Sequence, residues 1–171
     1  MKSFNLAVPR VLALALASSL LAAPNSTHKE SPPAWFWGCW IVKKALPISG
    51  VVGISPKQEK AIIGTRIMFA PTCARWRGTV LKSPKYSVKV LSADKFFDIE
   101  RLPLSEIGVR GEHVTEVEVD LPGTLSDLDF IGAYTYLRNR DIVLEVEGDC
   151  LLAEKAKPGD PKCECESPRT K

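Results

Sequence analysis

The chain has 171 residues, of which 45% are hydrophobic and 25% are charged, and this is enough for one domain with an apolar core. Two of its 23 basic residues, Lys2 and Arg10, lie in the first 23 positions, whereas all 20 acidic residues lie beyond them. The rest of the chain is therefore nearly neutral and has no basic cluster, which excludes nucleic acid as a partner.

The first 23 residues have the pattern of a cleaved secretory signal peptide. Basic residues precede an uncharged apolar run at 11–21, and the small residues Ala22 and Ala23 follow it. The run is too short to span a bilayer, which needs about 20 apolar residues. No cysteine lies at the junction, so we expect no lipid anchor. We predict a signal peptide at 1–23 and a secreted or periplasmic protein with no transmembrane segment in the mature chain.

Composition divides the remainder into three parts. Residues 24–33 are polar and end in two prolines, which is typical of a linker. Residues 34–156 carry the hydrophobic pattern of a folded domain. Residues 157–171 are charged, contain proline and two cysteines, and have no apolar face, so we expect a flexible tail unless a cysteine ties it down.

Hydrophobic residues in 34–156 recur mostly with a period of two, which predicts β-strands. We expect strands at 36–42, 62–70, 72–80, 85–91, 113–121, 130–137, 142–147 and 150–154. Turns containing Asn139 and Gly148 predict that the last three strands are adjacent and antiparallel. The side chains expected to face the core there are Ile142, Leu144, Val146, Leu151 and Ala153.

Only two short helices are predicted, one that Ser92 caps and that runs to Phe97, and one between Pro103 and Gly108. Since no long amphipathic helix covers an open sheet, the strands must cover their own faces. We therefore predict an all-β fold, an antiparallel eight-stranded up-and-down barrel. A β-sandwich is the alternative.

The first strand contains Gly38-Cys39-Trp40, which resembles the Gly-x-Trp motif that opens the barrels of lipocalins and related calycins. The resemblance implies that Trp40 plugs one end of the barrel and that the barrel holds a small apolar ligand. It also implies a closing arginine packed on the tryptophan. Arg140 is the candidate for this role, although it lies in a predicted turn.

Five cysteines lie beyond the signal peptide, and an exported protein normally joins them in disulfides. We predict one bridge from the tail, at Cys163 or Cys165, to the body at Cys73 or Cys39. Cys150 lies in an apolar strand pattern and is expected to be a buried free thiol. The Cys163-x-Cys165 pair lacks the surroundings of a metal site, so no metal is predicted.

Catalytic patterns are weak. His113 is the one histidine in the predicted domain, and no nucleophile motif accompanies it. The carboxylate pairs Asp98/Glu100, Glu116/Glu118 and Asp127/Asp129 are predicted to lie on solvated surfaces. We therefore expect a protein that is not an enzyme and that uses no cofactor.

The function that we expect is binding, in a lipocalin-like cup, of a small apolar molecule. The residues predicted to line the cup are Trp40, Arg66, Phe69, Trp76, Tyr134 and Tyr136, with Arg66 facing a carboxylate head group. The alternative is a secreted module that binds an extracytoplasmic protein, such as an inhibitor or envelope factor, through the loops 82–85 and 122–129. An extracytoplasmic hydrolase that uses His113 is a further alternative.

Overall fold

The computed structural model describes residues 31–48, 53–126, 129–160, 163 and 165. The predicted signal peptide and the linker up to residue 30 lie outside the described residues. One antiparallel sheet dominates the described part, which confirms the predicted all-β, barrel-like fold. Its nine strands are β1 (Gly38–Ala45), β2 (Arg66–Phe69), β3 (Cys73–Trp76), β4 (Thr79–Lys82), β5 (Tyr86–Ser92), β6 (His113–Val119), β7 (Tyr134–Arg138), β8 (Asp141–Val146) and β9 (Asp149–Lys155).

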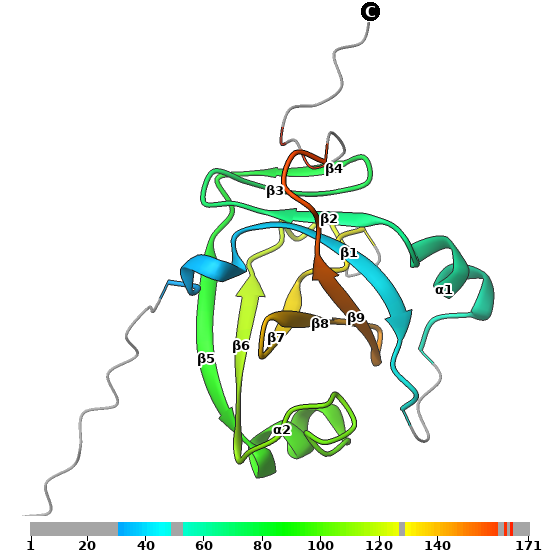
Figure 1. Ribbon diagram of the computed structural model, residues 1–171, viewed down its shortest axis with the longest axis vertical. Helices are drawn as coiled ribbons and strands as arrows, with labels where there is room; N and C mark the ends of the chain where they lie inside the picture. The colour runs from blue at the N-terminus through cyan, green and yellow to red at the C-terminus, as the bar shows by residue number, and fades with distance from the viewer. Residues whose placement is uncertain (1–30, 49–52, 127–128, 161–162, 164, 166–171) are drawn as a thin grey trace, which may run out of the picture.

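The strands follow an up-and-down order around a curled sheet. The order is β4-β3-β2-β1-β9-β8-β7-β6-β5, so that strands consecutive in sequence are paired throughout, except at the junction of β4 and β5. The first and last strands close the series, since β1 pairs with β9 from Trp40↔Lys155 to Ala45↔Leu151. In Figure 1, β2, β3 and β4 cross the top of the molecule, and β5 and β6 run down one side.

One bent passage of the chain joins the two ends of the strand order. The prediction of a single strand at 72–80 was wrong, because the chain reverses at Arg77, with φ of 52°, and Gly78 to form the β3–β4 pair. After β4 the chain bends at Ser83, which has φ of 48°, and Pro84, and then continues as β5. β4 pairs with β3 and β5 pairs with β6, so the sheet has nine strands, one more than the eight predicted.

Two α-helices lie outside the sheet. α1 (Pro56–Ile62) was not predicted, although Ser55 and Gln58 form a capping box and proline occupies the first turn. α2 (Ala93–Glu100) confirms the helix predicted after Ser92, whose side chain caps it. The helix predicted between Pro103 and Gly108 was wrong, since these residues form turns held by bonds such as Gly108 N to Ser105 O, 3.0 Å. The chain at 34–36 is a short 3-10 helix, η1 (Ala34–Phe36), rather than the start of a strand.

Large side chains fill the inner face of the curled sheet, the inner core. Phe36 stacks on Phe69 with ring centres 4.7 Å apart, and Phe130 meets Phe69 edge-on at 6.3 Å. The side chains predicted to face the core from the last two strands all belong to this cluster: Ile142, Leu144, Val146, Leu151 and Ala153. An eight-stranded barrel is just wide enough for such side chains, so this interior is a packed core.

A second cluster, the outer core, lies between the opposite face of β5–β9 and the segment 93–109. Phe96 of α2 meets Tyr136 of β7 with ring centres 5.0 Å apart, and Ile107 is fully buried. Glu116 was predicted to lie on a solvated face, which was wrong, because it is only 4% exposed under this cover. The sheet is therefore buried on both faces along β6.

Two disulfides tie the C-terminal segment to the sheet. Cys39 pairs with Cys163, with Cα atoms 5.5 Å apart, and Cys73 pairs with Cys165, with Cα atoms 6.2 Å apart. Both disulfides join the tail to the body, which confirms the predicted kind of pairing. The predicted number, one disulfide, was too low by one. Cys150 is free and buried. Among the described residues, no helix is long and apolar enough to cross a membrane.

Candidate functional site

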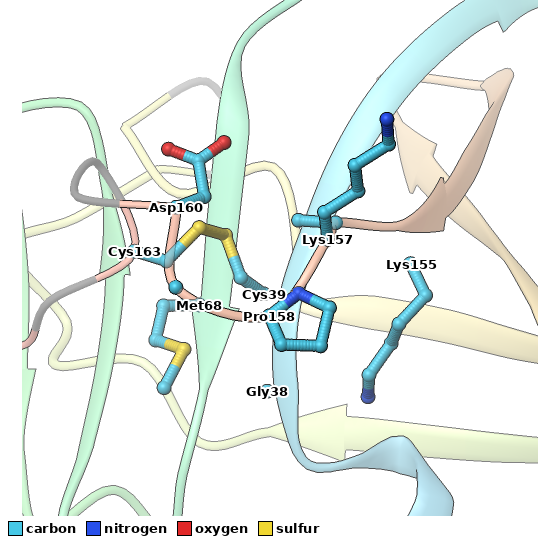
Figure 2. Close-up of a pocket in the computed structure, with 10 residues that line it drawn as sticks. Gly38, Cys39, Met68, Lys155, Lys157, Pro158, Asp160 and Cys163 are labelled. Atoms are coloured by element: carbon cyan, nitrogen blue, oxygen red, sulfur yellow. A yellow bond between two sulfur atoms is a disulfide. The ribbon is translucent and has the colours of Figure 1, made fainter.

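A groove lies where the tail leaves the end of β9 and crosses β1 and β2. We call it the tail groove, and its volume is about 530 Å³. Figure 2 shows its lining, which comes from the start of β1, from Met68 of β2 and from the tail between Lys155 and Cys163. A groove of this size falls within the range of small-molecule sites, about 300–1,000 Å³.

The surface of the tail groove is largely apolar and is fixed in place by bonds on both sides. Met68, Pro158 and the Cys39–Cys163 disulfide supply the apolar contacts. The tail is positioned by a backbone hydrogen bond from Ala156 N to Cys39 O, 2.9 Å, and by the disulfide at Cys163. The groove is therefore preformed in the folded protein.

Arg66, predicted to face a carboxylate head group, faces a carboxylate of the protein itself. Its Nε lies 2.6 Å from a carboxylate oxygen of Asp160 in the tail, and both side chains are largely buried. The pair neutralises the acidic residue of the groove. Lys155 and Lys157 then carry the remaining charge, and in Figure 2 their ammonium groups point in opposite directions.

Lys155 holds the N-terminal segment against the end of the sheet. Its Nζ donates hydrogen bonds to the carbonyl oxygens of Trp35, 2.7 Å, and Trp37, 2.5 Å, and lies 4.2 Å from the centre of the Trp40 ring. The Nε1 of Trp40 donates to the carbonyl oxygen of Phe36 at 2.9 Å. Partial burial lowers the pKa of Lys155.

The cation on Trp40 is therefore a lysine from the end of β9, and the proposed role of Arg140 was wrong. Arg140 is exposed in the turn between β7 and β8. Nothing in the sequence marks Lys155, because it lies 118 residues from Trp37 and follows a polar residue like many surface lysines.

Among the described residues, those predicted to line a cup are divided between the two faces of the sheet. Trp40, Phe69 and Trp76 belong to the inner core, with exposed fractions of 0%, 0% and 3%. Tyr136 lies on the opposite face of the sheet, where its hydroxyl donates to Glu100 at 2.6 Å, and Tyr134 lies on that face too. The open space of the tail groove touches none of these aromatic residues.

The loops 82–85 and 122–129, which were predicted to bind a protein, lie partly side by side. A hollow of about 430 Å³ is lined by residues 80–85 and 120–122, at the bend between β4 and β5. A backbone bond from Asp120 N to Lys85 O, 3.0 Å, joins the two segments. Pro122 lines the hollow, whereas Asp127 lies outside the described residues.

Glu100 and Glu116 lie near Tyr136 beside the outer core, whereas His113 and Asp129 lie elsewhere. Burial raises the pKa of Glu116, and Lys89, 3.4 Å away, opposes this effect. The Asp129 carboxylate accepts hydrogen bonds from the backbone N–H and the hydroxyl of Ser126, and these bonds lower its pKa. His113 is exposed at the start of β6, and no described carboxylate forms an ion pair with it.

Metal ligands do not cluster in the described part of the chain, where no three histidine, cysteine, aspartate or glutamate side chains are grouped to hold an ion. Comparison of the chain with protein-family models, with curated proteins and with solved structures found no match.

Proposed function

We propose that the protein is an exported, non-enzymatic binding protein whose ligand is a small, largely apolar molecule with an anionic group, held in the tail groove. The observation that carries this proposal is the preformed groove itself, which joins an apolar surface to two lysines. Export is supported by the two disulfides, because such bonds form and persist in oxidising compartments.

The apolar part of the ligand would lie on Met68, Pro158 and the Cys39–Cys163 bridge. Contact with such surfaces contributes about 25 cal/mol for each Å² removed from water. The anionic group would meet Lys157, which forms no ion pair among the described residues. Asp160 does not repel it, since Arg66 neutralises that carboxylate.

The architecture supports a lipocalin-like relationship in one respect. Trp40 is fully buried at the end of the sheet beneath a cation and beside the short helix η1. The position of the ligand would differ from the one that this resemblance implies, because aromatic side chains occupy the inner core.

The test compares dodecanoate with uncharged dodecanol, using tryptophan fluorescence and calorimetry on the oxidised protein. We expect dodecanoate to bind about tenfold more tightly, since one charge-assisted contact contributes about 1.5 kcal/mol. Lys157→Gln should remove this preference and leave dodecanol binding unchanged, whereas Met68→Ala should weaken both ligands. Lys60→Gln, at an exposed position of α1, is the matched control.

Two results would contradict the proposal. If neither dodecanoate nor dodecanol binds to the wild-type protein, small-molecule binding of this class is rejected. Binding that Lys157→Gln and Met68→Ala leave unchanged, but that Trp76→Ala abolishes, would place the ligand in the interior and restore the cup.

A second candidate function is protein binding through the hollow at the β4–β5 bend. It is favoured by the meeting of the two loops there and by the basic residues Lys82 and Lys85 on its rim. An acidic partner surface would suit these charges. Replacing both lysines by glutamate should then abolish co-purification of the partner from the secreted fraction and leave dodecanoate binding intact.

A further inference from the structure

A small polar cavity lies at the end of the sheet where β6 begins and β7 ends. Its volume is about 220 Å³, and the segment 109–110 after the outer core forms its remaining wall. The polar side chains that line it are Arg110, His113, Arg138 and Asn139. No acidic residue is among its lining residues, so the cavity is surrounded by positive charge and hydrogen-bond donors.

Arg138 is the central group of this cavity. Its Nε is buried and has no hydrogen-bond partner among the residues that the structure describes. The guanidinium lies against the backbone of Gly108, so closely that a Cβ at that position would be 2.6 Å from Cζ. A buried donor without an acceptor lowers stability by about 1–3 kcal/mol, and an arginine retains its charge in proteins.

The other arginines with described contacts show that this is unusual for the chain. Arg66 binds Asp160, and Arg77 lies over Trp76 and donates to the carbonyl oxygen of Ala61. Neither Arg110 nor Arg138 forms an ion pair within the part of the chain that the structure describes. Both line the same cavity.

We propose that this cavity is a binding site for a small oxyanion, a phosphate or sulfate group. Guanidinium groups bind such oxyanions through two parallel hydrogen bonds, and Asn139 and His113 can donate to the remaining oxygens. The cavity is smaller than the sites of drug-sized molecules, about 300–1,000 Å³, and therefore fits the anion or the terminal group of a monoester. This site is independent of the tail groove and of its ligand.

The first experiment titrates the oxidised protein with inorganic phosphate at constant ionic strength. Because the chain contains only two histidines, the imidazole signal of His113 can be followed by proton NMR and assigned with His113→Asn. We expect this signal to move with phosphate while that of His28 stays in place. At a phosphate concentration about ten times Kd, the Tm should rise by about 3–6 °C.

Variants test which residues are responsible. Arg138→Gln should weaken phosphate binding about tenfold to a hundredfold, as expected for loss of a charge-assisted contact. Arg110→Gln, at an exposed position that carries no structural contact, should weaken it about threefold to tenfold even if Arg138→Gln does not fold. Arg140→Gln is the matched control, because Arg140 is an exposed arginine two residues away that does not line the cavity.

Titration with sulfate and with phenyl phosphate distinguishes the sources of the oxyanion. Equal binding of sulfate and phosphate supports a site for free anions, and tighter binding of phenyl phosphate supports a site for the end of a monoester. The proposal is overturned if phosphate shifts neither the Tm nor the His113 signal more than sodium chloride does. It is also overturned if Arg110→Gln binds phosphate as tightly as the control variant Arg140→Gln does.

Discussion

The ammonium group of Lys155 lies 4.2 Å from the centre of the Trp40 ring and is bonded to the carbonyl oxygens of two further tryptophans, Trp35 and Trp37. The last residue of the sheet thus holds the segment that precedes its first strand. No other described lysine joins the two ends of the folded chain in this way.

Replacing Lys155 by methionine should lower the free energy of unfolding by about 1–3 kcal/mol, the sum expected for a cation–π contact and two hydrogen bonds at a partly exposed site. Urea denaturation followed by tryptophan fluorescence measures this loss. Lys155→Arg should retain most of the stability, and Lys157→Met serves as the control from the same tail. Equal stability of the Lys155→Met and Lys157→Met variants would contradict the role of Lys155.

Gly132 tests whether the inner core is closely packed. A Cβ at this position would lie 2.4 Å from Cδ1 of Ile67 and 2.6 Å from Cζ of Phe69, which are both fully buried. Gly132→Ala should therefore lower stability by about 1–3 kcal/mol through overpacking. Gly123→Ala is the matched control, since nothing lies within 4 Å of its added Cβ, and it should change stability by less than about 0.5 kcal/mol. A neutral Gly132→Ala variant would indicate unfilled space inside the sheet.

The pairing of the cysteines can be read by mass spectrometry of unreduced peptides. We expect the tail to yield Cys39–Cys163 and Cys73–Cys165, and no crossed pairs. Removing the first bridge with Cys39→Ser and Cys163→Ser should lower stability by about 2–5 kcal/mol, because the bridge closes a loop of more than a hundred residues. A large share of crossed pairs would show that the tail follows another path.

Cys150 should resist alkylation in the folded protein. Burial raises the pKa of its thiol to about 12, and the carboxylates of Glu100, Glu145 and Asp149 act in the same direction. The reactive thiolate is therefore scarce at about pH 8, and the sulfur is also inaccessible. Iodoacetamide should label Cys150 only after denaturation, and labelling of the native protein within minutes would be inconsistent with the outer core.

Glu116 should make stability depend on pH. Its pKa is raised from 4.5 by burial, so the folded protein binds more protons at this residue than the unfolded chain does. The free energy of unfolding should accordingly fall as the pH rises from about 4.5 through the raised pKa, and should stay lower above it.

Glu116→Gln removes the ionisable group and keeps its shape. The Tm of the variant minus the Tm of the wild-type protein, measured by calorimetry, should be larger at neutral pH than at about pH 4. The reason is that only the wild-type protein carries the buried charge at neutral pH. Lys89 keeps Glu118 as a partner at 2.6 Å in the variant. Glu154→Gln, which removes an exposed carboxylate, controls for the change in net charge. A difference in Tm that is larger at low pH would refute the assignment.

Local sequence patterns predict the strands of the sheet, but they do not predict which segments cover its outer face. Alternation along β6 correctly places Val117 and Val119 in the inner core, and the positive-φ residues Asn139 and Gly148 fix the last two hairpins. The burial of Glu116 depends on Lys89 and on α2, which arrive from other elements, so no local period reveals it. The turn at Arg77 and Gly78 was missed because both flanking segments have the same strand pattern.

The candidate site was less predictable than the fold. The sequence pattern favours aromatic residues, of which Trp40, Phe69 and Trp76 pack in the inner core because they bury the most apolar surface. The tail groove is lined by Met68, Pro158 and lysines, residue types that occur on any surface. The oxyanion cavity brings together Arg110, which precedes β6, and Arg138, which ends β7. Only the cysteines indicated that the tail would return to the body.

The pairing of β1 with β9 has a consequence for biosynthesis. The first strand meets its second neighbour only when the ninth has been made, and the contact between Lys155 and Trp35 spans 120 residues. Long-range pairing of this kind is slow, since the intervening loop must first be brought together. Trp40 therefore stays uncovered while the chain is being made, and only the finished polypeptide can close the sheet around it. Chains that end before residue 149 lack β9, so β1 and β8 are each left with one unpaired edge.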